Sequence, residues 1–140
     1  MRYLKISACF LVMSIFISCD PGIRFQKIIE NQSDYDVKVY IYRDTSQYYE
    51  VSYLADSFLI GNHSEMVLAE RVGLGQYYKF SDCQLYVDSL KIMVLDNDSI
   101  IVNVDINKPV SWHFRRTKAM SNGGGECECR LMLSNIHFQQ

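Results

Sequence analysis

The chain has 140 residues, of which 49% are hydrophobic, 13% aromatic and 21% charged, and its formal net charge is −2. This is the composition of an ordinary globular protein, and it excludes the disordered, collagen-like and low-complexity classes. The acidic balance also argues against nucleic acid as a partner, because phosphate binding requires a basic surface.

The N-terminus combines a short positive segment with an apolar run. Arg2 and Lys5 flank the start of an uncharged stretch over 6–17, which is too short to span a bilayer and has the length of a secretory signal. The stretch ends in Phe16-Ile17-Ser18-Cys19, which resembles the lipobox of bacterial lipoproteins, with phenylalanine at the position where leucine is preferred. The resemblance implies cleavage before Cys19 and acylation of that residue. We therefore expect a lipoprotein signal peptide over 1–18 and a lipidated tether over 19–22; the alternatives are an ordinary signal peptide or a buried N-terminal helix.

Residues 23–140 are predicted to form one domain built of β-strands. Apolar and polar residues alternate in many short segments, as in strands with one buried face. Clear alternation is found at 37–42, 49–53, 90–94, 100–104, 110–114 and 127–133, and further strands are expected at 25–30, 58–60 and 66–69. No long segment has helical periodicity. The pattern predicts an all-β fold, an antiparallel β-sandwich of the immunoglobulin-like type with about seven to eight strands.

Polar turns separate these strands. Turn residues cluster at 31–34 and 61–64, and the glycine-rich stretch over 121–125 is predicted to be a flexible loop. Asp96-Asn97-Asp98 lies between two apolar runs and predicts a β-hairpin that pairs 90–94 with 100–104. In the segment 110–114, alternation places Val110, Trp112 and Phe114 toward the core and His113 toward solvent.

The order of these features resembles small immunoglobulin-like lipoproteins of the Bacteroidota type. Three segments carry the resemblance, namely 28–37, the strand and turn over 88–97, and the closing strand over 126–133. The sequence Ser18-Cys19-Asp20 is common in these lipoproteins. The resemblance implies anchoring at the outer membrane through the lipid on Cys19, with the domain in the periplasm or at the cell surface, and it implies no particular ligand.

Three cysteines remain after the lipidation site: Cys83, Cys127 and Cys129. Cys127 and Cys129 are two residues apart on one predicted strand, so a bond between them would need distorted geometry, whereas Cys83 can pair with either. A Cys₃His metal site with His113 or His137 is an alternative, although Cys-x-Cys is tighter than the usual ligand spacing. We predict core thiols or one disulfide here, with no metal and no cofactor.

Tyrosines and two serines are the candidate surface sites. Exposed tyrosines suit protein or glycan recognition, and the residues that alternation or pairing places outward are Tyr40, Tyr42, Tyr48 and Tyr78. The alternative is that tyrosine is simply common in strands. Ser89 and Ser99 lie in Asp-Ser-aliphatic triplets that resemble O-glycosylation sites of Bacteroidota.

The sequence contains no recognisable catalytic set, such as a Gly-x-Ser-x-Gly nucleophile elbow. We therefore expect a lipid-anchored cell-envelope module that is not an enzyme and acts by binding a protein or a glycan, or as an accessory subunit of an envelope assembly. Two alternatives stay open. One is a small metal- or thiol-dependent enzyme at Cys83, Cys127 and Cys129, and the other is a purely structural spacer.

Overall fold

The computed structural model describes residues 22–42, 52–53, 55–74, 82–83, 89–119 and 124–139. Strands dominate this part of the chain, and the only helices in it are two single 3₁₀ turns, η2 (Pro109–Ser111) and η3 (Asn135–His137). The strands are β1 (Gly22–Asn31), β2 (Val37–Tyr42), β3 (Ser52–Tyr53), β4 (Ser57–Ile60), β5 (Ser64–Leu74), β6 (Ser89–Val94), β7 (Ile101–Val102), β8 (His113–Ala119), β9 (Gly125–Leu133) and β10 (Phe138–Gln139).

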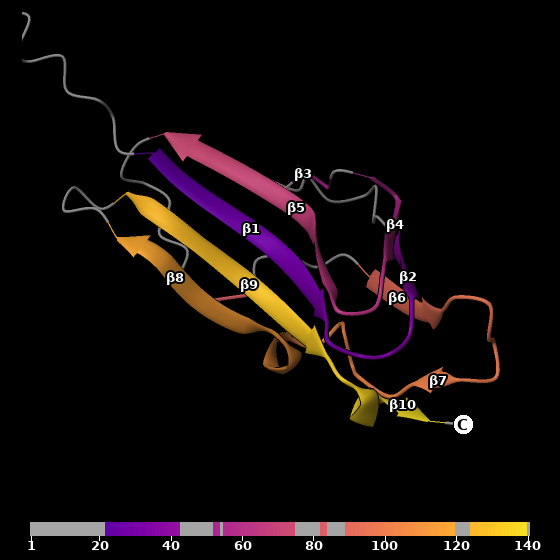
Figure 1. Ribbon diagram of the computed structural model, residues 1–140. Coiled ribbons are helices and arrows are strands. Elements are labelled where there is room, and N and C mark those ends of the chain that lie inside the picture. The colour runs from indigo at the N-terminus through magenta and orange to yellow at the C-terminus, as the bar shows by residue number, and fades with distance from the viewer. Residues whose placement is uncertain are drawn as a thin grey trace, which may run out of the picture.

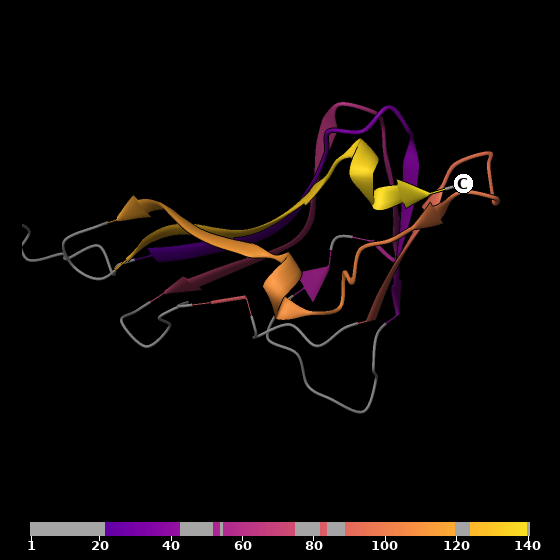
Figure 2. The same ribbon diagram turned by 90° about the horizontal axis from the view of Figure 1, so that it is seen from below.

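The strands form three sheets, which confirms the predicted all-β sandwich. The long five-stranded sheet has the order β3-β5-β1-β9-β8, the second sheet β4-β2-β6, and the third β10-β7. Figure 1 shows the three-stranded sheet at one end of the long sheet, and Figure 2 shows that it stands across it. All pairs are antiparallel except β1 and β9, which run parallel in the middle of the long sheet.

Two of the connections between the two larger sheets are adjacent turns. One connects β1 to β2 and the other connects β4 to β5, and the fully buried Asn31 joins them. Its side-chain amide donates to the carbonyl oxygens of Tyr35 at 2.7 Å and Gly61 at 3.0 Å, and its side-chain oxygen accepts from the Ser33 hydroxyl at 2.6 Å. A buried amide satisfied in this way holds both turns in one arrangement.

The core lies between the long sheet and the three-stranded sheet. Alternate residues of each strand point into it, as the period of two requires. The largest fully buried apolar side chains come from both sheets, and they are Phe25, Ile29, Val37, Val39, Ile60, Leu68, Leu131 and Leu133. Burial of each such side chain contributes about 1.5–3 kcal/mol to the stability of the fold. The burial of these apolar side chains is therefore the main interaction that holds the two sheets together.

The prediction of a hairpin around residues 96–98 is wrong. The chain does turn there, with Asp96 in the left-handed region at φ 59°, but the two flanking strands do not pair with each other. β6 pairs with β2, and β7 pairs with the C-terminal β10. Local turn residues predicted the change of direction, whereas the pairing was decided by segments far away in the sequence.

The predicted strand over 110–114 is also corrected. Pro109 begins the 3₁₀ turn η2, so Val110 lies on the surface with 81% of its area exposed. Proline fixes its own φ near the helical value and thereby favours such a turn. Trp112 is buried, Phe114 half-buried and His113 exposed, as the alternation predicts.

The loop predicted over 121–125 ends before Gly125, because β9 begins at that residue. Residues 121–123 lie outside the described residues, and Gly125 is the first residue of β9. Its φ of 143° and its contact with Lys118 leave no space for a Cβ atom, which would collide with the Lys118 carbonyl oxygen. Glycine is therefore required at this position by the β8–β9 pairing.

Candidate functional site

The outward surface of the three-stranded sheet is the candidate functional site. Residues of β2, β4 and β6 that alternate with the buried ones point away from the core. We call this surface the outer sheet face, and it consists of Lys38, Tyr40, Tyr42, Leu59, Lys91 and Met93.

Strand register arranges these side chains in rows across the sheet. Lys38 lies between Leu59 on β4 and Met93 on β6, and Tyr40 lies beside Lys91. The Lys38 ammonium sits 4.8 Å from the centre of the Tyr40 ring, within the range of a cation–π contact. The face therefore alternates apolar and cationic groups at the spacing of neighbouring strands.

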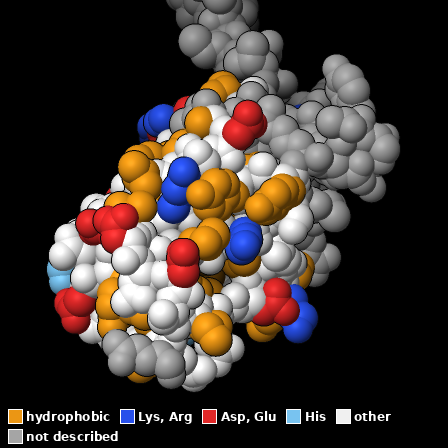
Figure 3. All heavy atoms as spheres, turned by 90° about the vertical axis from the view of Figure 1, so that its right-hand side faces the viewer, with side chains coloured by type: hydrophobic (Ala, Val, Ile, Leu, Met, Phe, Trp, Pro, Cys, Tyr) orange, Lys and Arg blue, Asp and Glu red, His pale blue; other side chains and the backbone are white. Residues whose placement is uncertain are grey.

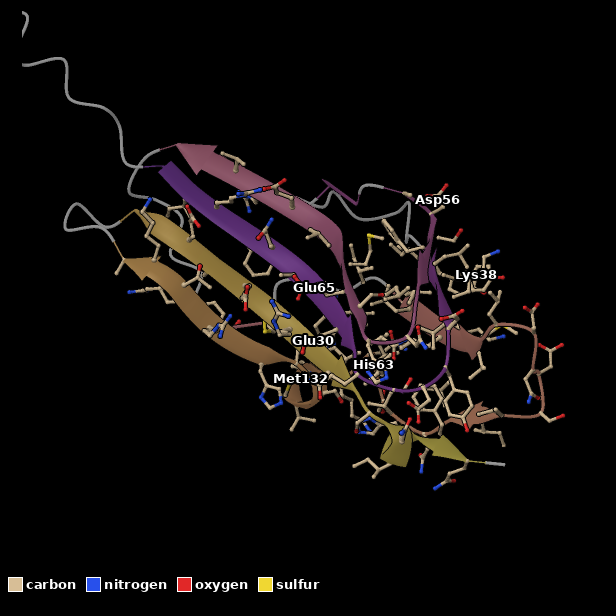
Figure 4. The ribbon with its side chains drawn as sticks, viewed as in Figure 1. Glu30, Lys38, Asp56, His63, Glu65 and Met132 are labelled. Atoms are coloured by element: carbon tan, nitrogen blue, oxygen red, sulfur yellow. A yellow bond between two sulfur atoms is a disulfide. The ribbon has the colours of Figure 1, made fainter. Side chains whose placement is uncertain are left out.

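Tyr42, Leu59 and Lys91 of this face are exposed, and its other three residues are half-buried. Tyr42 is 54% exposed and Leu59 is 58% exposed, both far above the level of core residues. Figure 3 shows hydrophobic side chains on this side of the molecule together with Lys or Arg side chains, with Asp or Glu side chains both among them and toward the edges. Figure 4 places Lys38 and Asp56 on this same side, away from the long sheet. Such a surface can bury apolar area and offer a phenol hydroxyl and two ammonium groups to a partner.

The predicted tyrosines divide into two groups. Tyr40 and Tyr42 lie on the outer sheet face, while Tyr48 and Tyr78 lie outside the described residues, as does Cys19. Ser89 lies opposite Tyr42 in the sheet register, so this candidate glycosylation site is at the edge of the same face. Ser99 lies in the turn that follows β6, and both serines are exposed.

The cysteines form a disulfide in the core. Cys83 is bonded to Cys129, and Cys127 is a buried free thiol. Burial raises the pKa of Cys127 to about 11, against the opposing charge of Arg116. Two of the three sulfurs proposed as metal ligands are therefore bonded to each other, and the third is protonated at neutral pH, so they do not form the thiolate set that zinc binds.

The two histidines of the metal alternative line one surface pocket together, and none of Cys83, Cys127 and Cys129 lines that pocket. His113 is exposed at the start of β8, whereas the His137 ring nitrogen Nδ1 accepts from the Ser134 backbone N–H at 3.0 Å and caps η3. Within the described ranges, no group of three or more His, Cys, Asp or Glu side chains is placed to hold a metal ion.

A charged cluster covers the outward surface of the long sheet. Arg130 on β9 contacts Glu30 at 2.6 Å, Glu65 at 2.5 Å and Glu128 at 3.1 Å. Burial disfavours the charged form of Arg130, but the hydrogen bonds that its guanidinium donates to these carboxylates outweigh this effect and raise the pKa of Arg130. Hydrogen bonds from Gln32 and Arg130 lower the pKa of Glu30. Glu30 and Glu65 lie side by side over the strands in Figure 4. Arg115 on β8 also contacts Glu128 at 2.8 Å, so two guanidinium groups face three carboxylates, and these contacts connect β1, β5, β8 and β9.

Sequence reasoning missed two buried charged residues, Lys27 and the Glu128 described above. Lys27 is only 4% exposed, and its Nζ lies 4.4 Å from the centre of the Trp112 ring. The alternation of β1 contains the signal, since Lys27 stands between the inward residues Phe25 and Ile29. A lysine at an inward position needs an aromatic ring or a polar group beside it, and only the fold reveals which one is there.

Comparison of the chain with protein-family models, with curated proteins and with solved structures finds no match. None of the helical turns in the described part of the chain has the length and apolarity needed to cross a bilayer.

Proposed function

We propose that this protein is a lipid-anchored module of the cell envelope that binds another protein through the outer sheet face. The observation that carries the proposal is the exposure of Tyr42 and Leu59 beside Lys38 and Lys91 on one sheet surface. Aromatic and aliphatic groups surrounded by charges are typical of the centre and rim of a protein interface.

A protein partner fits this face better than a glycan. The ammonium of Lys38 covers the Tyr40 ring, and Tyr42 is the tyrosine left more than half exposed among those described on this face. The two lysines select a partner that carries carboxylates at matching positions, because complementary charge sets orientation and association rate.

The anchor and the compartment are part of the same proposal. Cys19 carries the lipid at the outer membrane, and β1 begins at Gly22, so two residues separate the lipidated residue from the domain. The Cys83–Cys129 disulfide supports an extracytoplasmic site, because such bonds persist in oxidising compartments.

Site-specific photocrosslinking in intact cells tests the proposal. A photoreactive residue at Leu59 is expected to give one discrete crosslinked product, and the same residue at the exposed Val72 of the long sheet is the matched control. The substitution Tyr42→Ser should reduce the Leu59 crosslink about tenfold, since a central aromatic contributes about 1–2 kcal/mol or more to an interface. Intact mass of the purified protein should begin at an acylated Cys19.

Three results would contradict this function. The first is a crosslink of equal yield at Leu59 and Val72, which is the behaviour expected of a spacer crowded by neighbours. The second is a Leu59 crosslink to glycan instead of protein. The third is a mature mass without acyl chains, which removes the membrane anchor.

A further inference from the structure

One edge of the three-stranded sheet has backbone groups that are not used within the sheet. β6 pairs with β2, and Leu95 donates its N–H to the Asp36 carbonyl at 2.8 Å, so Lys91, Met93 and Leu95 bond toward β2. In an antiparallel pair the bonding direction alternates, and the N–H and C=O groups of Leu90, Ile92 and Val94 therefore point to the free edge.

The first of these three positions already binds an amide. The Leu90 N–H donates to Oδ1 of Asn107 at 2.7 Å, and Nδ2 of Asn107 donates to the Leu90 carbonyl at 3.0 Å. The Asn107 side chain thus makes the same pair of bonds that a neighbouring strand would make. At Ile92 and Val94 no such group is present among the described residues, and these edge groups have no hydrogen-bond partner there.

A cleft of about 420 Å³ lies along this edge. Consecutive residues of β6 form one wall, and the segment after the turn forms the other, with apolar side chains from Ile100, Val102, Val104 and Ile106. β7 does not close the cleft, because it pairs with β10. We call this feature the edge cleft; Lys91 and Asp98 are its charged lining residues.

We propose that the edge cleft binds an extended segment of a partner protein, which adds to the sheet as a strand paired with β6. The edge requires a ligand that carries both donors and acceptors at the spacing of alternate residues, and an extended polypeptide has this chemistry. Its alternate side chains are apolar, because they meet the apolar wall of the cleft, and its other side chains lie beside Lys91 and Asp98.

This inference goes beyond the proposed function. The edge cleft shares Lys91 and Met93 with the outer sheet face, but its hydrogen-bonding groups belong to the backbone of β6. A partner could occupy the face, the edge or both, and each has its own test.

The experiment is an NMR titration of the folded protein with a short synthetic peptide. The peptide consists of alternating valine and threonine, with a lysine and a glutamate at its ends. Amide exchange at Ile92 and Val94 is expected to slow by roughly fivefold or more at saturation, the fold-change of about one net hydrogen bond. The Leu59 amide, which points to the opposite edge of the same sheet by the β2–β4 register, is the internal control and should not change. A peptide that is N-methylated on the edge facing β6 should not bind.

Two matched variants locate the site. Val102→Glu places a charge in the apolar wall and should weaken peptide binding by about tenfold or more. Val110→Glu makes the same substitution on an exposed valine that does not line the cleft, and it should have no effect. Tyr42→Ser should leave the titration unchanged, which separates this inference from the outer sheet face.

Several results would overturn the inference. The first is slower amide exchange at Leu59 in place of Ile92 and Val94 when the peptide is added. The second is equal binding of the N-methylated peptide. The third is slow amide exchange of Ile92 and Val94 in the free protein caused by self-association. A negative titration could also result from low affinity for the free peptide. The same peptide is therefore also fused after Gln140 through a flexible linker, which raises its effective concentration to about millimolar. Absence of protection in that fusion would likewise contradict strand addition.

Discussion

At the scale of single residues, Cys127 and Cys129 show that position in the fold decides the chemical state of two identical side chains. Both face the core from β9, and Cys129 is bonded to Cys83 while Cys127 keeps its thiol. The raised pKa of Cys127 keeps the sulfur protonated at neutral pH, so it cannot attack the neighbouring disulfide as a thiolate.

The same shift makes stability depend on pH in a defined direction. The folded thiol has a pKa of about 11 and the ordinary value is 9.0, so the folded state retains the proton more strongly. Its contribution to the free energy of unfolding is complete below about pH 9 and falls as pH rises toward 11. Urea unfolding of wild type and Cys127→Ala at about pH 8 and about pH 10.5 should show the wild-type advantage shrinking by about 1–2 kcal/mol. A difference that stays constant over this range would contradict the shift.

At the scale of elements, the corner between the sheets depends on Asn31. This residue ends β1 and bonds the backbone of the β1–β2 turn and the β4–β5 turn from a fully buried position. Without its side chain, the carbonyl groups of Tyr35 and Gly61 would lose donors inside the protein, where water cannot easily replace them.

Asn31→Ala is therefore expected to lower the free energy of unfolding by about 2–4 kcal/mol, the cost of several buried polar groups left unpaired. Asn62→Ala is the matched control, because Asn62 is exposed in the second turn and uses its backbone N–H, which contacts Asp36 at 2.7 Å. Chemical denaturation monitored by the fluorescence of Trp112 measures both. Equal stabilities of the two variants would show that the corner does not depend on the buried amide.

At the scale of the whole molecule, the disulfide connects segments that are distant in the chain. Cys83 precedes β6 and Cys129 lies in β9, at a sequence separation of 46. Closing a loop of this length restricts the unfolded chain, and this contributes about 2–4 kcal/mol to stability.

The double variant Cys83→Ala/Cys129→Ala should lose that amount in guanidinium unfolding, and wild type treated with a reductant should lose a similar amount. Cys127→Ala keeps the disulfide and serves as the control for removing a core sulfur. If the single and double variants unfold at the same denaturant concentration, the bond contributes nothing measurable and the core alone supports the fold.

Local patterns in the sequence predicted many of the strands and side-chain orientations, but not the 3₁₀ turn at Pro109–Ser111. Alternation in 37–42 and 127–133 predicted which residues of β2 and β9 are buried, because the side chains of a strand change sides at every residue. The same rule placed Tyr40 and Tyr42 outward together, and it identified the cysteines that could pair with Cys83.

Tertiary structure decided which elements meet. The sequence alone determined that this protein is built of strands with one buried face, since alternation and turn residues act over a few positions. Only the fold decided that β1 pairs in parallel with β9, that Cys83 bonds Cys129, and that β6 and β7 separate at Asp96 instead of forming a hairpin. These outcomes depend on contacts between segments that are far apart in the chain, and a local pattern carries no information about which distant partner satisfies its hydrogen bonds.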